Sequence, residues 1–289
     1  MDGLAQKRVQ RYCFFFILPN FLKRNCRIYS FFVNLHLRIA NDACRMMLCK
    51  TEALVLHAFK YGETRMIIDV FSRDAGRLSL IAALPKTSKS RLKKQYFQPM
   101  TMLEIEYEQR QRVQLQKLKD ARLLSPYTSV PFSPEKLALS LFVAEFLYHA
   151  LRSEQRNEPL FLYVCNAMQW LDMSGQGYAN FHLTFLMHMS RFLGFFPNLD
   201  EYREGCVFDL RAGTFLDNAP LHRDFLQPAD ARHIQILMRM DFPTMHLYRL
   251  SRHDRNRIVN VLLTYYRLHI PQFPELKSLT VLQELWPDS

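Results

Sequence analysis

The sequence predicts an α+β protein with more than one domain, in which a five-stranded β-barrel precedes an α-helical domain. Three observations favour this fold class. Short segments rich in Val, Ile, Leu and Phe fill residues 47–125, and apolar segments of helical length fill residues 135–289. A proline- and serine-rich linker, residues 126–134, separates them. The 289 residues, 49% of them hydrophobic, suffice for a buried core in each part.

Five segments before the linker have the length and composition of β-strands. Glycines at Gly62 and Gly76 mark turns between the first three, because glycine accepts a positive φ without steric cost. Five short antiparallel strands predict a small closed barrel of the OB type, although an SH3-like barrel fits the same periodicity. The segments are Ala53–Phe59, Met66–Ser72, Arg77–Ala83, Met102–Tyr107 and Val113–Leu118.

A run of cations lies between the third and fourth predicted strands. Hydroxyl residues separate these cations and no acid interrupts them. Lysines and hydroxyls on a loop match DNA phosphates, which demand charge more than shape, so we predict DNA contacts here. The alternative is a solvated surface that binds nothing. The predicted DNA-binding set is Lys86, Lys89, Arg91, Lys93 and Lys94, together with Lys60 and Arg65 on either side of the first turn.

Aromatic residues border these cations. Tyr96 and Phe97 follow the basic run, and Phe59 and Tyr61 end the first predicted strand. Cations beside aromatic rings suit a groove for single-stranded nucleic acid, because cations hold the backbone and rings stack on bases. For each ring taken alone, packing in the core is the stronger expectation.

The second half of the chain predicts a packed bundle of helices. Ser133 and Pro134 have the residue types of an N-cap and a first helical position, and Ser251 with Asp254 begins a later helix. A compact β-turn element is expected around Phe208–Phe215. The expected helices begin at Pro134 and continue with Pro159–Met173, Ala179–Phe195, Ser251–His269 and Ser278–Leu285.

Four arginines gather at the start of the helix that follows Ser251. They are Arg249, Arg252, Arg255 and Arg257. The favoured interpretation is an exposed polar face. The functional alternatives are a second phosphate contact or a dock for an acidic peptide of a partner protein.

No pattern of catalytic residues or metal ligands stands out. His182 and His188 are six residues apart, so they do not share a helix face as i, i+4 ligands would. The acids Asp209, Asp217 and Asp224 are spread over irregular sequence, and no Walker A or G-x-G-x-x-G motif occurs. We therefore expect a protein that is not an enzyme and needs no cofactor. The rival, a metal-dependent phosphodiesterase, would require clustered carboxylates.

The net charge of +11 is concentrated in the first half of the chain: residues 1–46 carry +6, residues 47–130 carry +7 and residues 131–289 carry −2. This distribution favours a polyanionic partner for the barrel. Residues 1–46 contain only short, interrupted apolar runs and no C-x-x-C pair. We expect them to be a non-native or disordered leader, with the native start at Met46 or Met47. A membrane-surface segment is the alternative.

Several short motifs follow one another along the chain. They are K-T-E-A-L-V-L (Lys50–Leu56), Y-G-E-T (Tyr61–Thr64), V-F-S (Val70–Ser72), G-R-L-S-L-I-A (Gly76–Ala82), L-G-F-F-P-N-L-D (Leu193–Asp200), F-D-L-R-A-G-T-F (Phe208–Phe215) and L-K-S-L-T-V-L-Q-E-L (Leu276–Leu285). In this order they resemble the bacterial RecO family of recombination mediators, and the resemblance covers about residues 47–289. In that family the first motif begins almost at the initiating methionine.

The resemblance implies a cytoplasmic, nucleoid-associated protein that binds single- and double-stranded DNA and anneals complementary strands. It also implies binding of the acidic tail of single-strand-binding protein, and loading of RecA together with RecR and, in some species, RecF. Many RecO relatives carry a four-cysteine zinc module after the L-G-x-x-P-x-L-D segment. Cys206 stands alone there, so zinc is not carried over, and we expect a degenerate, zinc-less module near residues 200–217.

Overall fold

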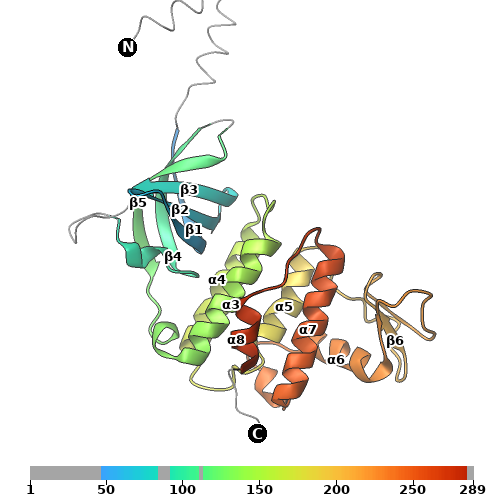
Figure 1. The fold of residues 1–289 in the computed structure, drawn as a ribbon. Coiled ribbons are helices and arrows are strands. Elements are labelled where there is room, and N and C mark those ends of the chain that lie inside the picture. Colours follow the sequence, from blue (N-terminus) through green and yellow to red (C-terminus); the bar gives the residue numbers. More distant parts are fainter. Residues whose placement is uncertain (1–46, 84–91, 111–112, 285–289) are drawn as a thin grey trace, which may run out of the picture. The chain divides into compact units, whose positions relative to one another are not determined.

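The computed structural model describes residues 47–83, 92–110 and 113–284 (Figure 1). A β-barrel is followed along the chain by helices and a small sheet, and the barrel and the helices belong to one compact unit. The α+β fold class predicted from the sequence is confirmed. The expected leader, residues 1–46, lies outside the described residues.

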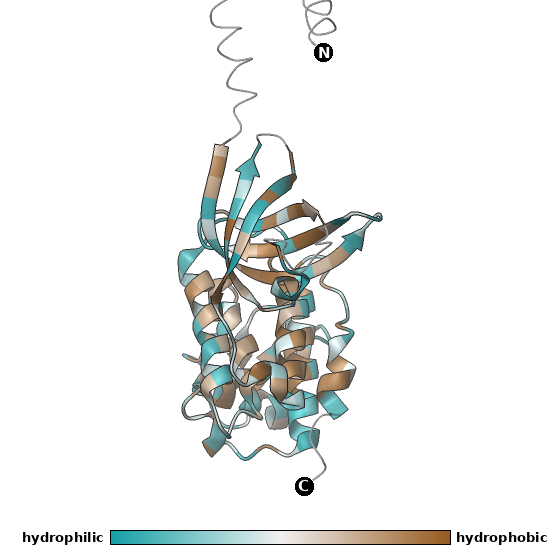
Figure 2. Cartoon of the chain, turned by 90° about the vertical axis from the view of Figure 1, so that its left-hand side faces the viewer, coloured by the Kyte–Doolittle hydropathy of each residue, from teal (hydrophilic) through white to brown (hydrophobic). Residues whose placement is uncertain are grey.

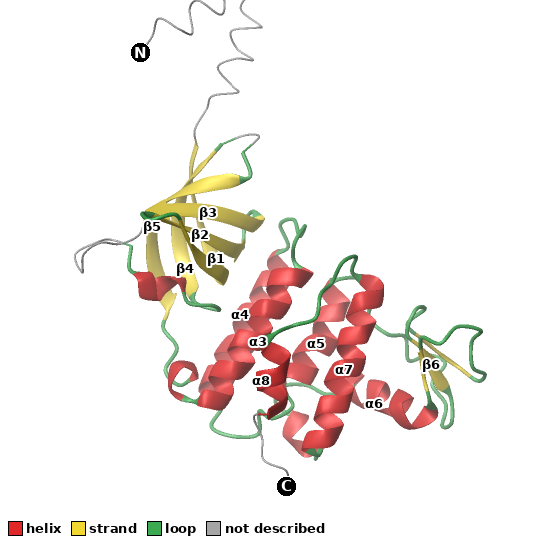
Figure 3. Ribbon diagram, in the orientation of Figure 1, coloured by secondary structure: helices red, strands yellow, loops and turns green. Residues whose placement is uncertain are grey.

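The barrel closes in the strand order β1-β2-β3-β5-β4 (Figure 3). The expectation of a purely antiparallel barrel is wrong at one pair, because β3 and β5 run parallel. Strand β4 lies between them in the chain and runs antiparallel to β5, so β3 and β5 point the same way. The OB-type barrel is confirmed. The strands are β1 (Met47–Tyr61), β2 (Arg65–Ser72), β3 (Gly76–Ala83), β4 (Met102–Gln109) and β5 (Leu115–Ser125).

A β-bulge divides β1 into two halves with opposite side-chain alternation. The register with β2 shifts between Val55 and His57. Ala53 and Val55 belong to the core inside the barrel, and after the bulge Ala58 packs against that core. Side chains alternate across a strand, so His57 and the odd-numbered residues that follow it point outward. Figure 2 shows that the barrel strands carry both apolar and polar residues along their length.

The helical part contains the expected helices and one that was not expected. Ser133 accepts a hydrogen bond from the amide of Lys136, and Ser251 with Asp254 forms a capping box, so both predicted helix starts are confirmed. No helix in the described ranges has the length and apolar composition to cross a membrane. The helices are α3 (Pro134–Ala150), α4 (Glu158–Met173), α5 (Phe181–Phe192), α6 (Pro228–Met238), α7 (Arg252–His269) and α8 (Ser278–Glu284).

Helix α6 escaped the sequence interpretation although its signals are present. Pro228 occupies the first turn with Asp230, a combination that favours a helix start. Ala231, Ile234 and Leu237 recur every three residues and are buried. The β-turn element expected around Phe208–Phe215 is a small sheet of β6 (Val207–Asp209), β7 (Thr214–Leu216) and β8 (Phe225–Leu226) in the order β7-β6-β8.

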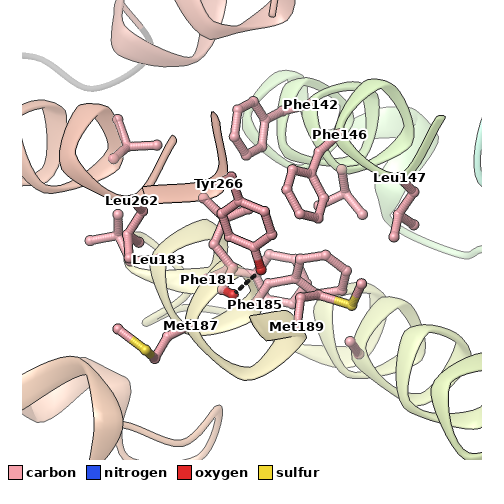
Figure 4. Packing of buried hydrophobic residues seen from close by; sticks show 14 of the residues in the cluster. Phe142, Phe146, Leu147, Phe181, Leu183, Phe185, Met187, Met189, Leu262 and Tyr266 are labelled. Atoms are coloured by element: carbon pink, nitrogen blue, oxygen red, sulfur yellow. Dashed lines mark hydrogen bonds between the residues drawn. The ribbon is translucent and has the colours of Figure 1, made fainter. Parts of the chain in front are cut away.

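Large aromatic side chains fill the core between the helices (Figure 4). Phe146 of α3 meets Tyr266 of α7 edge to face, with ring centroids 4.8 Å apart. The Tyr266 hydroxyl donates to the carbonyl of Leu186 at 2.7 Å, so this buried polar group is satisfied. Burial raises the pKa of this tyrosine and keeps it neutral.

The same core extends onto the outer face of the barrel. Leu54, Leu56, Phe71 and Met102 belong to it, and the ring of Phe71 lies 6.0 Å from that of Phe161 on α4. The segment Ala53–Leu56 of β1 is therefore buried on both faces. This double burial explains why these four residues form an unbroken apolar run instead of an alternating one.

The linker is held by the carboxylate of Asp172 at the end of α4. It accepts hydrogen bonds from the amides of Thr128 at 2.8 Å, Ser129 at 2.8 Å and Val130 at 2.9 Å. The buried Lys136 ammonium donates to the hydroxyl of Ser129 at 2.6 Å and to the carbonyl of Asp172 at 3.0 Å. Burial would raise the pKa of Asp172, but the backbone hydrogen bonds outweigh it and lower the pKa from 3.8 to about 2.

Candidate nucleic-acid interface

Two of the predicted DNA-binding cations lie at one end of the barrel. Lys60 and Arg65 are exposed on either side of the β1–β2 turn, where Gly62 adopts a φ of 64°. Arg65 pairs in register with Tyr61 on β1 and with Ala83, the last residue of β3. Ala83, the last described residue before the basic loop, therefore lies at the same end of the barrel as Arg65.

The basic loop itself is described only at its end. Lys86, Lys89 and Arg91 lie outside the described residues. Lys93 and Lys94 are exposed at the start of a 3-10 helix, Lys94–Phe97, which follows the loop. The Lys93 ammonium sits 5.9 Å from the centre of the Tyr96 ring, in cation–π range. A cation beside a partly exposed ring therefore occurs on this element.

The aromatic residues near these cations divide into buried and exposed rings. Phe97 is 4% exposed and belongs to the core inside the barrel, so the expectation of core packing is confirmed for it. The same expectation is wrong for Phe59 and Tyr61, which are 41% and 54% exposed. The cause is the bulge in β1, which turns every second residue from His57 onward away from the barrel interior.

Apolar and cationic residues accompany the exposed rings across neighbouring strands. Phe59 pairs with Ile67 of β2, which pairs with Ile81 of β3, and Ile81 pairs with Lys117 of β5. Paired residues in a sheet share a face, so these side chains lie on the outside of the barrel with Phe59. The outer face of β1, β2, β3 and β5 thus combines exposed rings, half-buried isoleucines and exposed cations, as surfaces that bind single-stranded nucleic acid do.

The arginine cluster at the start of α7 is largely engaged within the protein. The Arg252 side chain donates to the Gln283 carbonyl at 2.9 Å, and the Arg255 side chain donates to the Leu250 carbonyl at 2.6 Å. Arg257 forms a 2.7 Å ion pair with Asp230 of α6. Arg249 is exposed. Three of the four arginines therefore brace neighbouring segments, and a second DNA or partner contact at this cluster stays a prediction, best carried by Arg249.

The histidines and aspartates considered as catalytic candidates have structural surroundings. His182 is 2% exposed, and burial together with the charge of Arg255 lowers its pKa to about 3. His188 lies 3.7 Å from Asp241. Asp209 accepts hydrogen bonds from two backbone amides of its own turn, those of residues 211 and 212. In the described ranges, no group of three His, Cys, Asp or Glu side chains could hold a metal ion.

Cys206, the lone cysteine of the region where a degenerate, zinc-less module is expected, is a buried core residue. It is 4% exposed and packs with Phe208 and Phe215 in the helical core. Tyr202 packs against Phe215 with ring centroids 5.0 Å apart. Apolar packing of this kind can hold the small sheet, and the lack of a zinc site stays a prediction.

Two family models together match most of the chain. Residues 46–127 match the model described as Recombination protein O N terminal, and residues 131–280 match Recombination protein O C terminal. The DNA repair protein RecO of Phocaeicola vulgatus is 46% identical over 240 residues, which are 83% of this chain and the whole of the relative. The RecO proteins of Bacteroides fragilis and Azobacteroides pseudotrichonymphae are 45% and 33% identical with the same coverage. The chain therefore belongs to the RecO family of DNA repair proteins.

Proposed function

We propose that this protein is a non-enzymatic recombination mediator that binds DNA through the outer face and the basic loop of its barrel. The observation that carries the proposal is that exposed cations lie near aromatic rings at two places on an OB-type barrel of a DNA repair family: Lys60 and Arg65 at the β1–β2 turn, and Lys93 and Lys94 at the 3-10 helix. Lys86, Lys89 and Arg91 complete the proposed phosphate-binding set. The protein would bind both single- and double-stranded DNA, and would work without a metal or other cofactor.

The proposed mechanism is mass action on a coated DNA strand, with no covalent chemistry. Phosphate contacts from the barrel and contacts with single-strand-binding protein would together loosen the coat and let complementary strands anneal. With RecR, and in some species RecF, the protein would then promote loading of RecA in the cytoplasm, at the nucleoid. The resemblance of the chain to RecO mediators supports these partners.

An apolar groove supports the proposed contact with the tail of single-strand-binding protein. The groove has a volume of about 400 Å³ and is lined by Tyr96, Leu123, Leu137 and Leu141, among others. The three leucines are 39%, 42% and 41% exposed, and the ammonium of Lys93 lies over the Tyr96 ring. An acidic tail that ends in apolar residues needs an apolar groove with a cation at its edge.

The salt dependence of DNA affinity tests the role of the basic loop. If all five loop cations contact single-stranded phosphates, each should contribute about −0.7 to the slope of log affinity against log salt concentration. Changing Lys86, Lys89, Arg91, Lys93 and Lys94 to Gln should lower affinity and make the slope shallower by about 3.5. Unchanged affinity and slope would remove the loop from the DNA site.

A matched control separates this local effect from the loss of net charge. Five exposed arginines of the helical part can be changed to Gln for the same change in charge, and this variant should keep the wild-type slope. They are Arg203, Arg223, Arg232, Arg239 and Arg267.

The mediator role requires a functional assay with the full chain. Complementary strands coated with the cognate single-strand-binding protein should anneal faster when the protein is added. Failure to bind either DNA or the coat would defeat the proposal, and magnesium-dependent cleavage of labelled DNA would show an enzyme instead.

A further inference from the structure

The second half of β1 carries a row of outward-pointing rings that no core explains. His57, Phe59 and Tyr61 occupy alternate positions, and all three are exposed. Neither Phe59 nor Tyr61 packs in either hydrophobic core. The rings of His57 and Phe59 are neighbours, with centroids 5.5 Å apart and planes tilted by 36°. Exposed aromatic rings at successive outward positions of one strand are costly to leave in water without a partner.

Cations lie at the turn end of this row and beside it. Arg65 pairs with Tyr61 in register, and Lys117 lies two strands beyond Ile67 on the same outer face. Both cations are exposed. In the described part of the chain, neither forms a salt bridge, so their charge is available to a ligand. A row of rings flanked by cations is complementary to a polyanion that also presents flat apolar faces.

The other end of the row continues onto the helical part of the protein. The ring of His57 lies 5.1 Å from that of Tyr148 on α3, and the guanidinium of Arg77 sits 4.5 Å above the Tyr148 ring. Arg77 is held there by the buried Asp69, at 3.7 Å. These contacts join β1 to α3 without covering His57.

A further cation stands at this junction. Arg152 follows the end of α3, is exposed, and forms no salt bridge with any described residue. It comes two residues after Ala150, the last residue of α3, the helix that carries Tyr148. Its charge adds to the effect of burial in lowering the pKa of Arg77 and of His149. An exposed cation is therefore present at this junction.

We propose that His57, Phe59 and Tyr61 form a stacking row for unpaired bases of single-stranded DNA, and that the strand continues onto the helical part, where Arg152 contacts its phosphates. This inference rests on the proposed DNA-binding function and names the form of DNA that this face takes. Unpaired bases offer their faces to aromatic rings, whereas bases in a duplex are already stacked on each other. A peptide partner would not need cations at both ends of the row.

Replacing the two largest rings tests the row. Base stacking contributes about 1–3 kcal/mol per base, so each ring should be worth about tenfold or more in affinity. The Phe59→Ala, Tyr61→Ala variant of the full chain should bind oligothymidylate about a hundredfold more weakly than wild type at one salt concentration. Its salt slope should stay unchanged, because no cation is removed, and its affinity for duplex DNA should stay unchanged.

Two further variants act as controls for the rings. The Phe59→Tyr, Tyr61→Phe variant keeps both rings and should keep wild-type affinity. Phe132→Ala removes a phenyl group that is 81% exposed elsewhere and should have no effect. Equal losses for single-stranded and duplex DNA would overturn the row as a reader of unpaired bases. A Phe59→Ala, Tyr61→Ala variant that keeps its DNA affinity but no longer binds RecR or single-strand-binding protein would also overturn the proposal, since the row would then bind a protein partner.

The helical end of the path is tested by Arg152→Gln. Loss of one phosphate contact should weaken single-strand binding and make the salt slope shallower by about 0.7. An unchanged slope would confine the strand to the barrel and overturn this part of the proposal. If the wild-type chain binds no DNA at all, the proposed function fails. If wild type binds and the ring variant binds equally well, only the stacking row fails.

Discussion

The carboxylate of Asp172 is predicted to be among the most valuable single groups for stability, because it fastens the linker between barrel and helices. Replacing it in the Asp172→Asn variant keeps the shape of the side chain but removes its charge. An amide has one acceptor oxygen and an NH₂ group, which cannot accept hydrogen bonds from the amides of Thr128, Ser129 and Val130 as two carboxylate oxygens do. At least one buried N–H group therefore loses its partner.

Two terms set the size of the effect. The pKa of Asp172 falls from 3.8 to about 2 in the folded protein. At roughly 1.4 kcal/mol per pH unit, this corresponds to about 2 kcal/mol of stability. An orphaned buried amide adds about 1–2 kcal/mol. We expect the free energy of unfolding at neutral pH to fall by about 2–4 kcal/mol, and the melting temperature by about 5–12 °C.

The pH dependence gives a sharper test than the magnitude. Because the folded pKa is depressed, the stabilisation is complete above the unfolded pKa of 3.8 and is lost as the pH falls towards about 2. Denaturant unfolding between pH 5 and pH 2 should show this loss in wild type and a smaller loss in Asp172→Asn. Asp200→Asn, at an exposed position, is the matched control. A variant that retains wild-type stability, or the full acid loss, would refute the reasoning.

Three further predictions concern other packed groups. Gly76→Ala should lower the free energy of unfolding, measured with denaturant, by more than about 2 kcal/mol. Gly76 has a φ of +69°, and a Cβ at this position would lie 2.5 Å from the Glu154 carbonyl oxygen. The backbone conformation alone accounts for about 1–2 kcal/mol of the loss. Gly62→Ala should lose only the energy of the backbone conformation, because no other atom lies within 4 Å of the Cβ that it would add. Glu145→Gln should speed amide hydrogen exchange at the start of α8, because the Glu145 carboxylate accepts hydrogen bonds from the amides of Lys277, just before the helix, at 3.0 Å and Ser278, its first residue, at 2.8 Å. Unchanged exchange would contradict this. Burial lowers the pKa of His182 to about 3, so below pH 6.5 only the unfolded chain binds a proton at this residue. The free energy of unfolding should therefore fall by about 1.4 kcal/mol for each pH unit below 6.5. His182→Gln should reduce that slope.

Much of the fold follows from local sequence patterns because the physics that forms those elements is local. Short segments rich in Val, Ile, Leu and Phe, bounded by turn residues, predicted the barrel strands, since such side chains favour extended backbone. The residue types at Ser133, Pro134 and Ser251 predicted helix starts, since capping involves only groups within one turn. The cationic residues of the barrel were predicted as a DNA site from charge alone, and Lys93 and Lys94 are indeed exposed.

Tertiary structure decided what depends on partners distant in the chain. The bulge in β1, set by pairing with β2, turned Phe59 and Tyr61 outward, and no property of their own segment distinguishes them from core rings. Carbonyl groups and an acid of other segments occupy most of the arginine cluster on α7. Asp172 became a key group only because residues 128–130 fold back onto the end of α4. The sequence by itself thus determined most of the elements and the family. Long-range contacts set the direction and the partners of the side chains, and so decided which rings and cations are exposed.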